Sequence, residues 1–190
     1  MNKNRYFVLA LVVAAIGTVA SFTLPPQNRG VAAAAESPVA RGKYLVTAMG
    51  CNDCHTPWSM TEAGPAPDMK RLLSGHPADF KLPAPPAGSE AWPVSVAATN
   101  TGWSGPWWIS YTANLTPDKA TGLGAWTVDE FLLALRSGRH QGRGRAILPP
   151  MPWPFISQLS DDDLRAVFAY LQSIPAIVNK VPEPQPPQAR

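Results

Sequence analysis

Two cysteines and a histidine stand within five residues of each other, in the sequence Cys51-Asn52-Asp53-Cys54-His55. Two thiols three positions apart can form thioether bonds to the two vinyl groups of one porphyrin, and the histidine that follows can offer its imidazole to the iron. The spacing therefore predicts one haem c, attached covalently through Cys51 and Cys54 and ligated by His55. The motif uses both cysteines of the chain, so none remains for a disulfide or for nucleophilic catalysis.

Two other uses of a cysteine pair are weighed against haem attachment. A thioredoxin-like dithiol needs a strand before the motif and alternating strands and helices after it, whereas a stretch rich in proline and tryptophan follows here. A structural zinc site needs four ligands, and the remaining histidines, His76 and His140, form no second pair of close ligands. The sequence favours haem attachment over both.

The second axial ligand of such a haem is sought among the methionines. Met49 ends a predicted helix next to the motif, so it is expected to pack in the core. Met60 lies five residues after His55, a reach of at most about 18 Å, which leaves no chain to cover the opposite face of the haem. Met69 has no rigid sequence around it. These three methionines are therefore poor candidates.

Met151 stands in the sequence Leu-Pro-Pro-Met-Pro-Trp-Pro, which covers residues 148–154. The fixed φ angles of its four prolines hold the backbone and reduce the entropy lost when a thioether is presented to iron. We therefore expect Met151 to be the distal ligand, although a methionine can also serve only to fill a gap in a core. His140 is the competing residue, and it would produce a bis-histidine haem.

Four arginines lie within ten residues of each other around His140: Arg136, Arg139, Arg143 and Arg145. A run of charges is usually exposed to solvent, but a haem brings two propionates, and guanidinium groups bind carboxylates through paired hydrogen bonds. One of the four arginines is therefore a candidate partner for a propionate. An acidic partner protein is a second use for such a patch.

The elements that must position these residues are predicted from caps and periodicity. Residues 38–49, 127–138 and 160–175 have the capping residues and apolar spacing of helices. Residues 58–111 are rich in Pro, Gly and Trp and show no sustained period, which predicts one long irregular insertion. Residues 181–190 hold four prolines and are expected to form a flexible tail. Together these elements predict an all-α fold.

The first 35 residues indicate export. A short basic start precedes an apolar run over residues 7–24, and small residues before Glu36 allow cleavage near Ala35. The 18-residue run also reaches the lower limit of a membrane span, so an uncleaved anchor is the alternative, with membrane association through residues 7–24. The domain itself is then expected over residues 36–180, in the periplasm.

The net charge of +3 comes from the exported leader. Three of the 16 basic residues precede the first acidic residue, so the rest of the chain carries 13 basic and 13 acidic residues. A neutral body removes the main support for nucleic-acid binding, and no nucleic-acid partner is expected.

Taken together, these residues resemble the class I cytochromes c, and more narrowly the cytochrome domains of membrane-bound alcohol, aldehyde and sugar-acid dehydrogenases. The resemblance rests on Cys-Asn-Asp-Cys-His-Thr at 51–56, Asn-Leu-Thr-Pro-Asp at 114–118, Thr-Gly-Leu-Gly-Ala-Trp at 121–126, Pro-Met-Pro at 150–152 and Leu-Ser-Asp-Asp-Asp at 159–163. It implies a cytochrome c fold in which Cys51, Cys54 and His55 carry the haem and Met151 completes the iron. The dehydrogenase subunits usually carry several haems, whereas this chain has one attachment motif.

The expected function is therefore that of a monohaem one-electron carrier and not of an enzyme in its own right. A dehydrogenase is the expected donor, and an oxidase or another cytochrome is the expected acceptor, in a periplasmic or membrane-associated chain. The alternatives are a peroxidase-like haem enzyme, which needs an open sixth position at the iron, and a haem-based sensor, for which no second signalling domain is seen.

Overall fold

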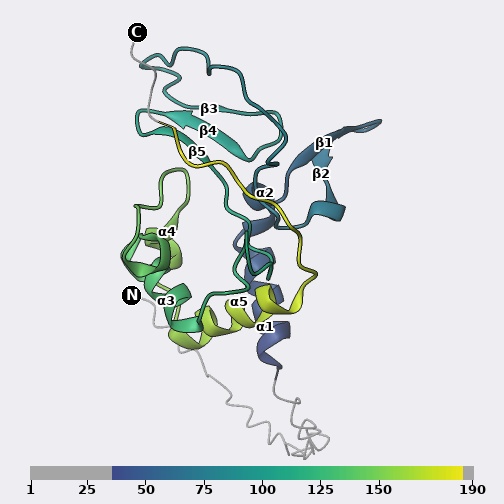
Figure 1. The fold of residues 1–190 in the computed structure, drawn as a ribbon, viewed down its shortest axis with the longest axis vertical. Coiled ribbons are helices and arrows are strands. Elements are labelled where there is room, and N and C mark those ends of the chain that lie inside the picture. Colours follow the sequence, from purple (N-terminus) through teal and green to yellow (C-terminus); the bar gives the residue numbers. More distant parts are fainter. Residues whose placement is uncertain (1–35, 186–190) are drawn as a thin grey trace, which may run out of the picture. The chain divides into compact units, whose positions relative to one another are not determined.

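The computed structural model describes residues 36–185, in which two helices are followed by five short strands and then by three more helices (Figure 1). The α-helices are α1 (Pro38–Ala48), α2 (Cys51–His55), α3 (Val128–Ser137), α4 (Trp153–Ile156) and α5 (Asp161–Ser173). The strands are β1 (Trp58–Thr61), β2 (Gly64–Pro67), β3 (Ser95–Val96), β4 (Gly102–Gly105) and β5 (Trp108–Tyr111). Two 3-10 turns, η1 (Met69–Arg71) and η2 (His140–Gly142), complete the set.

Part of the sequence-based interpretation falls outside these residues. The predicted signal peptide or anchor over residues 1–35 lies outside the described residues, as do the last five residues of the predicted tail. Within residues 36–185, no helix is both long enough and apolar enough to cross a bilayer.

The three helices predicted from caps and periodicity are confirmed as α1, α3 and α5. In α3 the capping box is complete: the Thr127 hydroxyl accepts the Glu130 amide at 3.2 Å, and the Glu130 carboxylate accepts the Thr127 amide at 2.9 Å. Side chains of Ser37 and Ser160 cap α1 and α5 in the same manner. Each of these three helices thus begins where a side chain accepts a hydrogen bond from a first-turn amide that has no partner within the helix.

Helices α1 and α5 cross at Gly42 and form the centre of the core. The missing side chain of Gly42 lets the backbone of α1 contact the backbone of Ala166 and the side chain of Tyr170 in α5. Phe131 of α3 packs on Phe168 of α5 with ring centroids 5.2 Å apart. The large buried apolar residues of these three helices are Leu45, Val46, Phe131, Leu132, Leu135, Leu164, Val167 and Leu171.

The expected all-α fold is wrong. Helices make up 33% and strands 13% of the described chain, and the strands form two small antiparallel sheets. Strand β1 pairs with β2, and β4 pairs with both β3 and β5, all within the predicted insertion over residues 58–111. A backbone segment next to a core must pair its amides and carbonyls in hydrogen bonds. These strands pair with each other to do so, but they lack the alternation of apolar and polar residues by which strands are predicted from a sequence.

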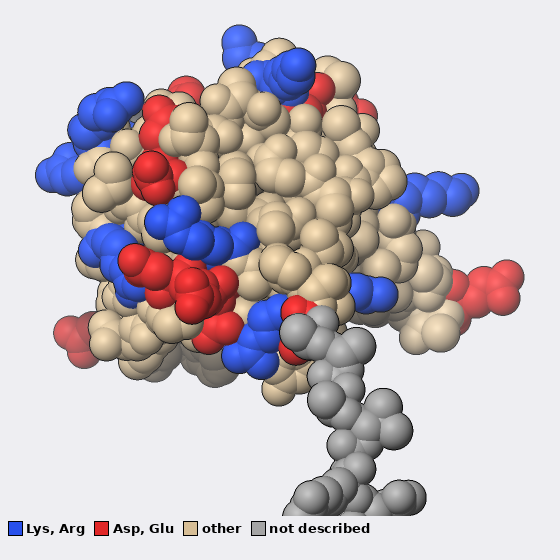
Figure 2. Space-filling model, turned by 90° about the horizontal axis from the view of Figure 1, so that it is seen from below, with Lys and Arg blue, Asp and Glu red and all other residues tan. Residues whose placement is uncertain are grey.

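Charges of both signs are mixed over the surface. Ion pairs join Arg41 to Asp163 at 2.9 Å and Arg136 to Asp161 at 2.5 Å. Seen from below, acidic and basic side chains lie beside one another (Figure 2). This face therefore presents no extended field of a single sign.

A buried histidine holds the insertion together. His76 is fully buried; its Nδ1 accepts the Thr101 hydroxyl at 2.9 Å, and its Nε2 donates to the Phe80 carbonyl at 3.1 Å. A carbonyl can only accept, so the proton of the neutral ring lies on Nε2. Burial lowers the pKa of His76, which favours this neutral form.

The crossing of α1 and α5 predicts the sign of one substitution. In an exposed helix, Gly→Ala stabilises by about 0.5–1 kcal/mol. Gly42→Ala should instead lower the free energy of unfolding by about 1–3 kcal/mol, because its methyl group overlaps the α5 backbone. Thermal unfolding monitored by circular dichroism measures the change. The exposed neighbour Lys43→Ala is the control and should change stability by less than about 0.5 kcal/mol; a stabilised Gly42→Ala protein would contradict the packing.

Burial of His76 predicts a loss of stability in mild acid. The folded-state pKa lies below the unfolded value of about 6.5, so the unfolded chain binds the proton first as the pH falls. The stabilisation is complete above about pH 6.5 and declines below it, by up to about 1.4 kcal/mol per pH unit for one proton. Urea unfolding at several pH values between 7.5 and 5 measures the slope. His76→Gln should reduce that slope, and an unchanged slope would show that other groups cause it.

Candidate functional site

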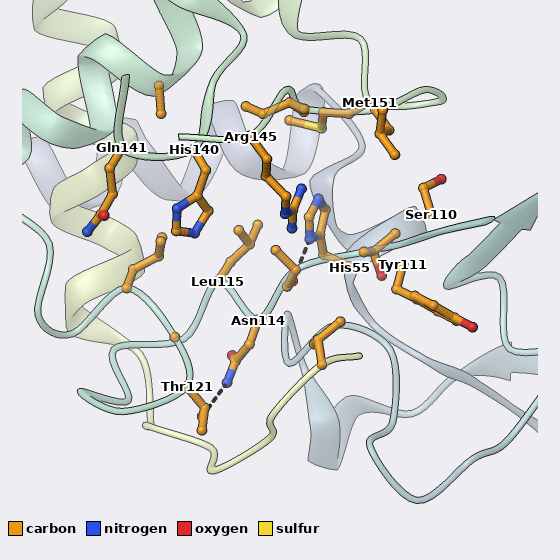
Figure 3. Close-up of a pocket in the computed structure, with 18 of the residues that line it drawn as sticks. His55, Ser110, Tyr111, Asn114, Leu115, Thr121, His140, Gln141, Arg145 and Met151 are labelled. Atoms are coloured by element: carbon orange, nitrogen blue, oxygen red, sulfur yellow. Dashed lines mark hydrogen bonds between the residues drawn. The ribbon is translucent and has the colours of Figure 1, made fainter. Parts of the chain in front are cut away.

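A cavity of ≈ 530 Å³ opens beside α2 and α3 (Figure 3). Its size falls within the range of about 300–1,000 Å³ that is typical of cofactor and ligand sites. The apolar side chains of its wall include Leu115, Leu123, Trp126, Phe131, Leu135, Ile147 and Leu148. The wall is therefore suited to a large apolar group.

Helix α2 presents the cysteines of the CxxCH motif at one edge of this cavity. Cys51 and Cys54 lie one helical turn apart, so their side chains leave the same side of the helix. Cys54 lines the cavity, and Cys51 packs against the adjoining core. Burial raises the pKa of Cys51 to about 11 and also raises the pKa of Cys54. Because a redox dithiol needs a lowered thiol pKa, these surroundings disfavour thioredoxin-like exchange.

His55, the last residue of α2, lines the same cavity and is 7% exposed. Its Nδ1 lies 2.8 Å from the carbonyl oxygen of Ala113. That oxygen can only accept, so Nδ1 carries the proton and Nε2 retains a free lone pair. Burial lowers the pKa of His55, and the hydrogen bond to Ala113 opposes that effect in part. The ring is thus held as a neutral imidazole, the form that binds metal ions.

Met151 reaches the cavity from a second, distant part of the chain. The proline-rich loop that carries it is joined to β5 by a hydrogen bond from the Ser110 hydroxyl to the Pro149 carbonyl, at 2.6 Å. His55 and Met151 therefore line one cavity, as Figure 3 shows with the methionine sulfur in yellow. Met60 and Met69, by contrast, are 79% and 65% exposed.

His140, the competing ligand, also lines the cavity. Its ring packs edge-on against Trp126, with centroids 4.8 Å apart. Burial lowers the pKa of His140, and the nearby charge of Arg145 lowers it further. The structure thus brings both candidates for the second axial ligand, Met151 and His140, to the same space.

The four clustered arginines have different surroundings. Arg136 pairs with Asp161, Arg143 lies 3.5 Å from Glu130, and Arg139 donates to the carbonyl of Gly144 at 3.1 Å. Of these four, Arg145 lines the cavity, and its Nε lies 3.3 Å from the carboxylate of Glu183. Two lysines, Lys119 and Lys180, share the lining. The cavity therefore carries three cations against one carboxylate, which leaves an excess of positive charge for an anionic group.

The sequence did not predict several residues of the site. The Ala113 carbonyl that orients His55 belongs to the backbone, so no residue type could reveal it. Residues 180–184 line the cavity, although residues 181–190 were expected to be a flexible tail. Gln185 exchanges two backbone hydrogen bonds with Ile109 of β5, at 2.8 and 3.0 Å, and Figure 1 shows this yellow segment running to β5. Proline content alone did not indicate this pairing.

These features fit a haem c. The two neighbouring thiols, the free Nε2 of His55 and the thioether of Met151 are the donors that such a group needs. The excess of cationic side chains matches its two propionates, and the apolar wall matches its ring.

Comparison with known proteins agrees with this fit. The chain is 30% identical over 164 residues to the gluconate 2-dehydrogenase cytochrome c subunit of Pantoea cypripedii, and the match covers 86% of this chain and 27% of that subunit. It is 28% identical over 148 residues to the fructose dehydrogenase cytochrome subunit of Gluconobacter japonicus, covering 78% of this chain and 24% of the relative. No protein-family profile matches the chain.

A shorter match is closer in sequence. Over 76 residues the chain is 40% identical to the cytochrome c subunit of the quinone alcohol dehydrogenase of Gluconobacter oxydans (strain 621H), covering 38% of this chain and 16% of the relative. The chain thus spans about a quarter or less of the length of these relatives. With the CxxCH motif at the edge of a cavity that fits a haem, these matches identify the chain as a c-type cytochrome related to the cytochrome c subunits of dehydrogenases.

Proposed function

We propose that this chain is a monohaem electron carrier that serves a dehydrogenase. The observation that carries the proposal is the meeting of His55 and Met151 in one cavity beside the cysteines of α2. A bound haem supplies a one-electron couple between ferric and ferrous iron, which needs no proton acceptor and no substrate carboxylate. The chain's own residues then have to attach, ligate and shield that group.

Each of the four residues has a separate task in this proposal. The thiols of Cys51 and Cys54 would hold the haem through thioether bonds, formed by addition of each S–H to a vinyl group without net oxidation. Nε2 of His55 and the sulfur of Met151 would be the ligands of the iron. A thioether ligand favours the reduced iron relative to a second imidazole, and an apolar wall disfavours the extra positive charge of the oxidised state. Both effects raise the reduction potential.

Arg145 is the residue of the arginine cluster that we assign to a propionate. It lines the cavity and already pairs with the carboxylate of Glu183 there. A propionate would compete with Glu183 for the same guanidinium group. Arg143, which pairs with Glu130 at the surface, has no such role in this proposal.

The relatives and the predicted export signal support a proposal for the cellular setting. Relatives that align along most of the chain are cytochrome subunits of dehydrogenases, so a dehydrogenase is the proposed electron donor. The acceptor would be an oxidase or another cytochrome. The predicted leader over residues 1–35 supports a periplasmic location for the proposed carrier, free or anchored.

Covalent attachment at one motif predicts the mass of the mature protein. After expression with the export and haem-attachment machinery, intact mass spectrometry should give the chain plus one haem, starting near residue 36 if the leader is cleaved. Acidified organic solvent should fail to extract the haem, because two thioether bonds hold it. Extractable haem, or none, would contradict the proposal. Full-length chain found only in membranes would favour the uncleaved anchor over processing.

The assignment of Met151 predicts a specific change of haem chemistry. Met151→Ala should leave the haem attached, because the bonds to Cys51 and Cys54 do not involve the methionine. The reduction potential should fall by more than about 59 mV, which is a tenfold change for one electron, because the thioether no longer favours ferrous iron. Added cyanide should bind faster at the vacant position. Spectroelectrochemistry and stopped-flow absorbance measure the two effects.

Matched variants test that assignment. Met60→Ala and Met69→Ala remove exposed methionines and should leave the spectrum and the potential unchanged. If His140→Ala alters both while Met151→Ala alters neither, the haem is bis-histidine and the electron-transfer function survives with a different ligand. Rapid cyanide binding and peroxidase activity in the unmodified protein would favour the alternative of a haem enzyme with an open position.

A further inference from the structure

His55 is held at two points by two different segments of the chain. Its ring Nδ1 donates to the carbonyl of Ala113 at 2.8 Å, and its own carbonyl accepts the amide of Gly75 at 2.7 Å. The two segments pair with each other, through the His76 amide to Thr112 at 3.0 Å and the Leu115 amide to Leu73 at 2.9 Å. The direction of the imidazole therefore depends on how these paired segments are fixed.

Gly75 shows how closely the two segments approach. Its φ of +76° belongs to the left-handed region, and a Cβ atom there would lie 2.6 Å from the carbonyl oxygen of Ala113. The carbonyl that accepts the His55 proton is thus in direct contact with residue 75. A small displacement of residues 73–76 would move this carbonyl, and with it the hydrogen bond to His55.

Asn114 fixes the peptide that carries this carbonyl. Its side chain is buried, with 3% of the residue exposed. Its Oδ1 accepts the amide and the hydroxyl of Thr116, at 3.0 and 2.7 Å, and its Nδ2 donates to the carbonyl of Ile177 at 2.8 Å. On the other side, the amide of Thr112 donates to Thr101 at 2.9 Å. The peptide between Ala113 and Asn114 is therefore held from both ends.

Asn179 fixes the partner segment. It is 5% exposed, and its Nδ2 donates to the carbonyls of Ser74 at 2.6 Å and His76 at 2.9 Å. Its Oδ1 accepts the amide of Ala78 at 3.0 Å. One amide side chain thus uses three hydrogen bonds to hold residues 74–78 against residues 177–179, the same segment to which Asn114 binds.

We propose that Asn114 and Asn179 are positioning residues for His55, so that the segment after α5 sets the strength of the hydrogen bond between His55 and Ala113. The proposal rests on the proposed function, because it concerns His55 as a haem ligand. Donation from Nδ1 makes Nε2 a more basic ligand, and a more basic ligand stabilises oxidised iron. The two asparagines therefore hold the reduction potential below the value it would have with a loosely held His55.

The test compares reduction potentials of the holo-protein and of two uncharged variants. Asn179→Ala removes all three hydrogen bonds of the Asn179 side chain. Asn114→Ser removes the hydrogen bond to the Ile177 carbonyl, because the shorter side chain cannot extend to it, and keeps a hydroxyl that can accept hydrogen bonds from Thr116. Both variants should raise the potential, with a shift of the equilibrium toward reduced iron of up to tenfold, or about 59 mV for one electron. Loss of a distal ligand would lower the potential instead, so the sign identifies the cause.

A matched control separates positioning from stability. Val46→Ala removes buried methyl groups from the core, and Val46 does not line the cavity. It should lower the melting temperature as the asparagine variants do and leave the potential unchanged. If the asparagine variants leave the potential unchanged, or lower it, the positioning role is wrong. If Val46→Ala raises it to the same degree, general destabilisation is the cause and the proposal fails.

Hydrogen exchange of the unmodified holo-protein provides a second measurement if the variants fail to acquire haem. The His55 Nδ1 proton and the Gly75 amide should exchange only on global unfolding, as slowly as the amide of Val46 in α1. Fast exchange at His55 and Gly75 with α1 still protected would overturn the proposal. Absence of a covalent haem or of a one-electron couple in the unmodified protein would overturn the proposed function itself. An unmodified couple that neither asparagine variant shifts overturns only the positioning role.

Discussion

The hydrogen bond between Nδ1 of His55 and the carbonyl of Ala113 requires that the backbone around both residues is held in place. It selects one tautomer of the ring and leaves Nε2 free to bind a metal. A bond to a backbone carbonyl has an exact direction only if the backbone on both sides is held. Three buried polar side chains near it, His76, Asn114 and Asn179, hydrogen-bond to the backbone of these segments. Burial of these three side chains is tolerated because their hydrogen bonds compensate for the loss of water.

The cavity combines an apolar wall with a limited number of charges. Trp126, Phe131 and Leu135 belong to the apolar part of the wall, and Lys119, Arg145 and Lys180 are the cationic residues of the lining. The ion pair between Arg145 and Glu183 is exposed, with 45% and 83% of the two side chains accessible to solvent, so it contributes little to stability. The segment after α5 therefore contributes to the wall, to its charge and to the support of His55.

The sheets of the insertion show why the all-α expectation was wrong. Strand β2 reads Gly-Pro-Ala-Pro, and prolines are accepted there because β1 is its single partner in a two-stranded sheet. Strand β3 is two residues long. Neither has an apolar alternation, since neither packs one full face on the core. These strands form because their backbone amides and carbonyls need hydrogen-bond partners where the segment lies against the rest of the domain. The residue types of a short stretch of sequence do not indicate that requirement.

The sequence alone determined the features whose physics is local. The spacing of Cys51, Cys54 and His55, the caps at Thr127 and Ser160, and the rigid surroundings of Met151 all depend on near neighbours, so they could be predicted from the sequence. Only the tertiary structure decided which carbonyl orients His55, which arginine lines the cavity and which segment closes it. His55 and Ala113 are 58 residues apart, and Asn179 and Ser74 are 105 apart. Such pairs are selected by the packing of the whole chain, because any carbonyl could accept these hydrogen bonds and only the fold brings one of them within reach.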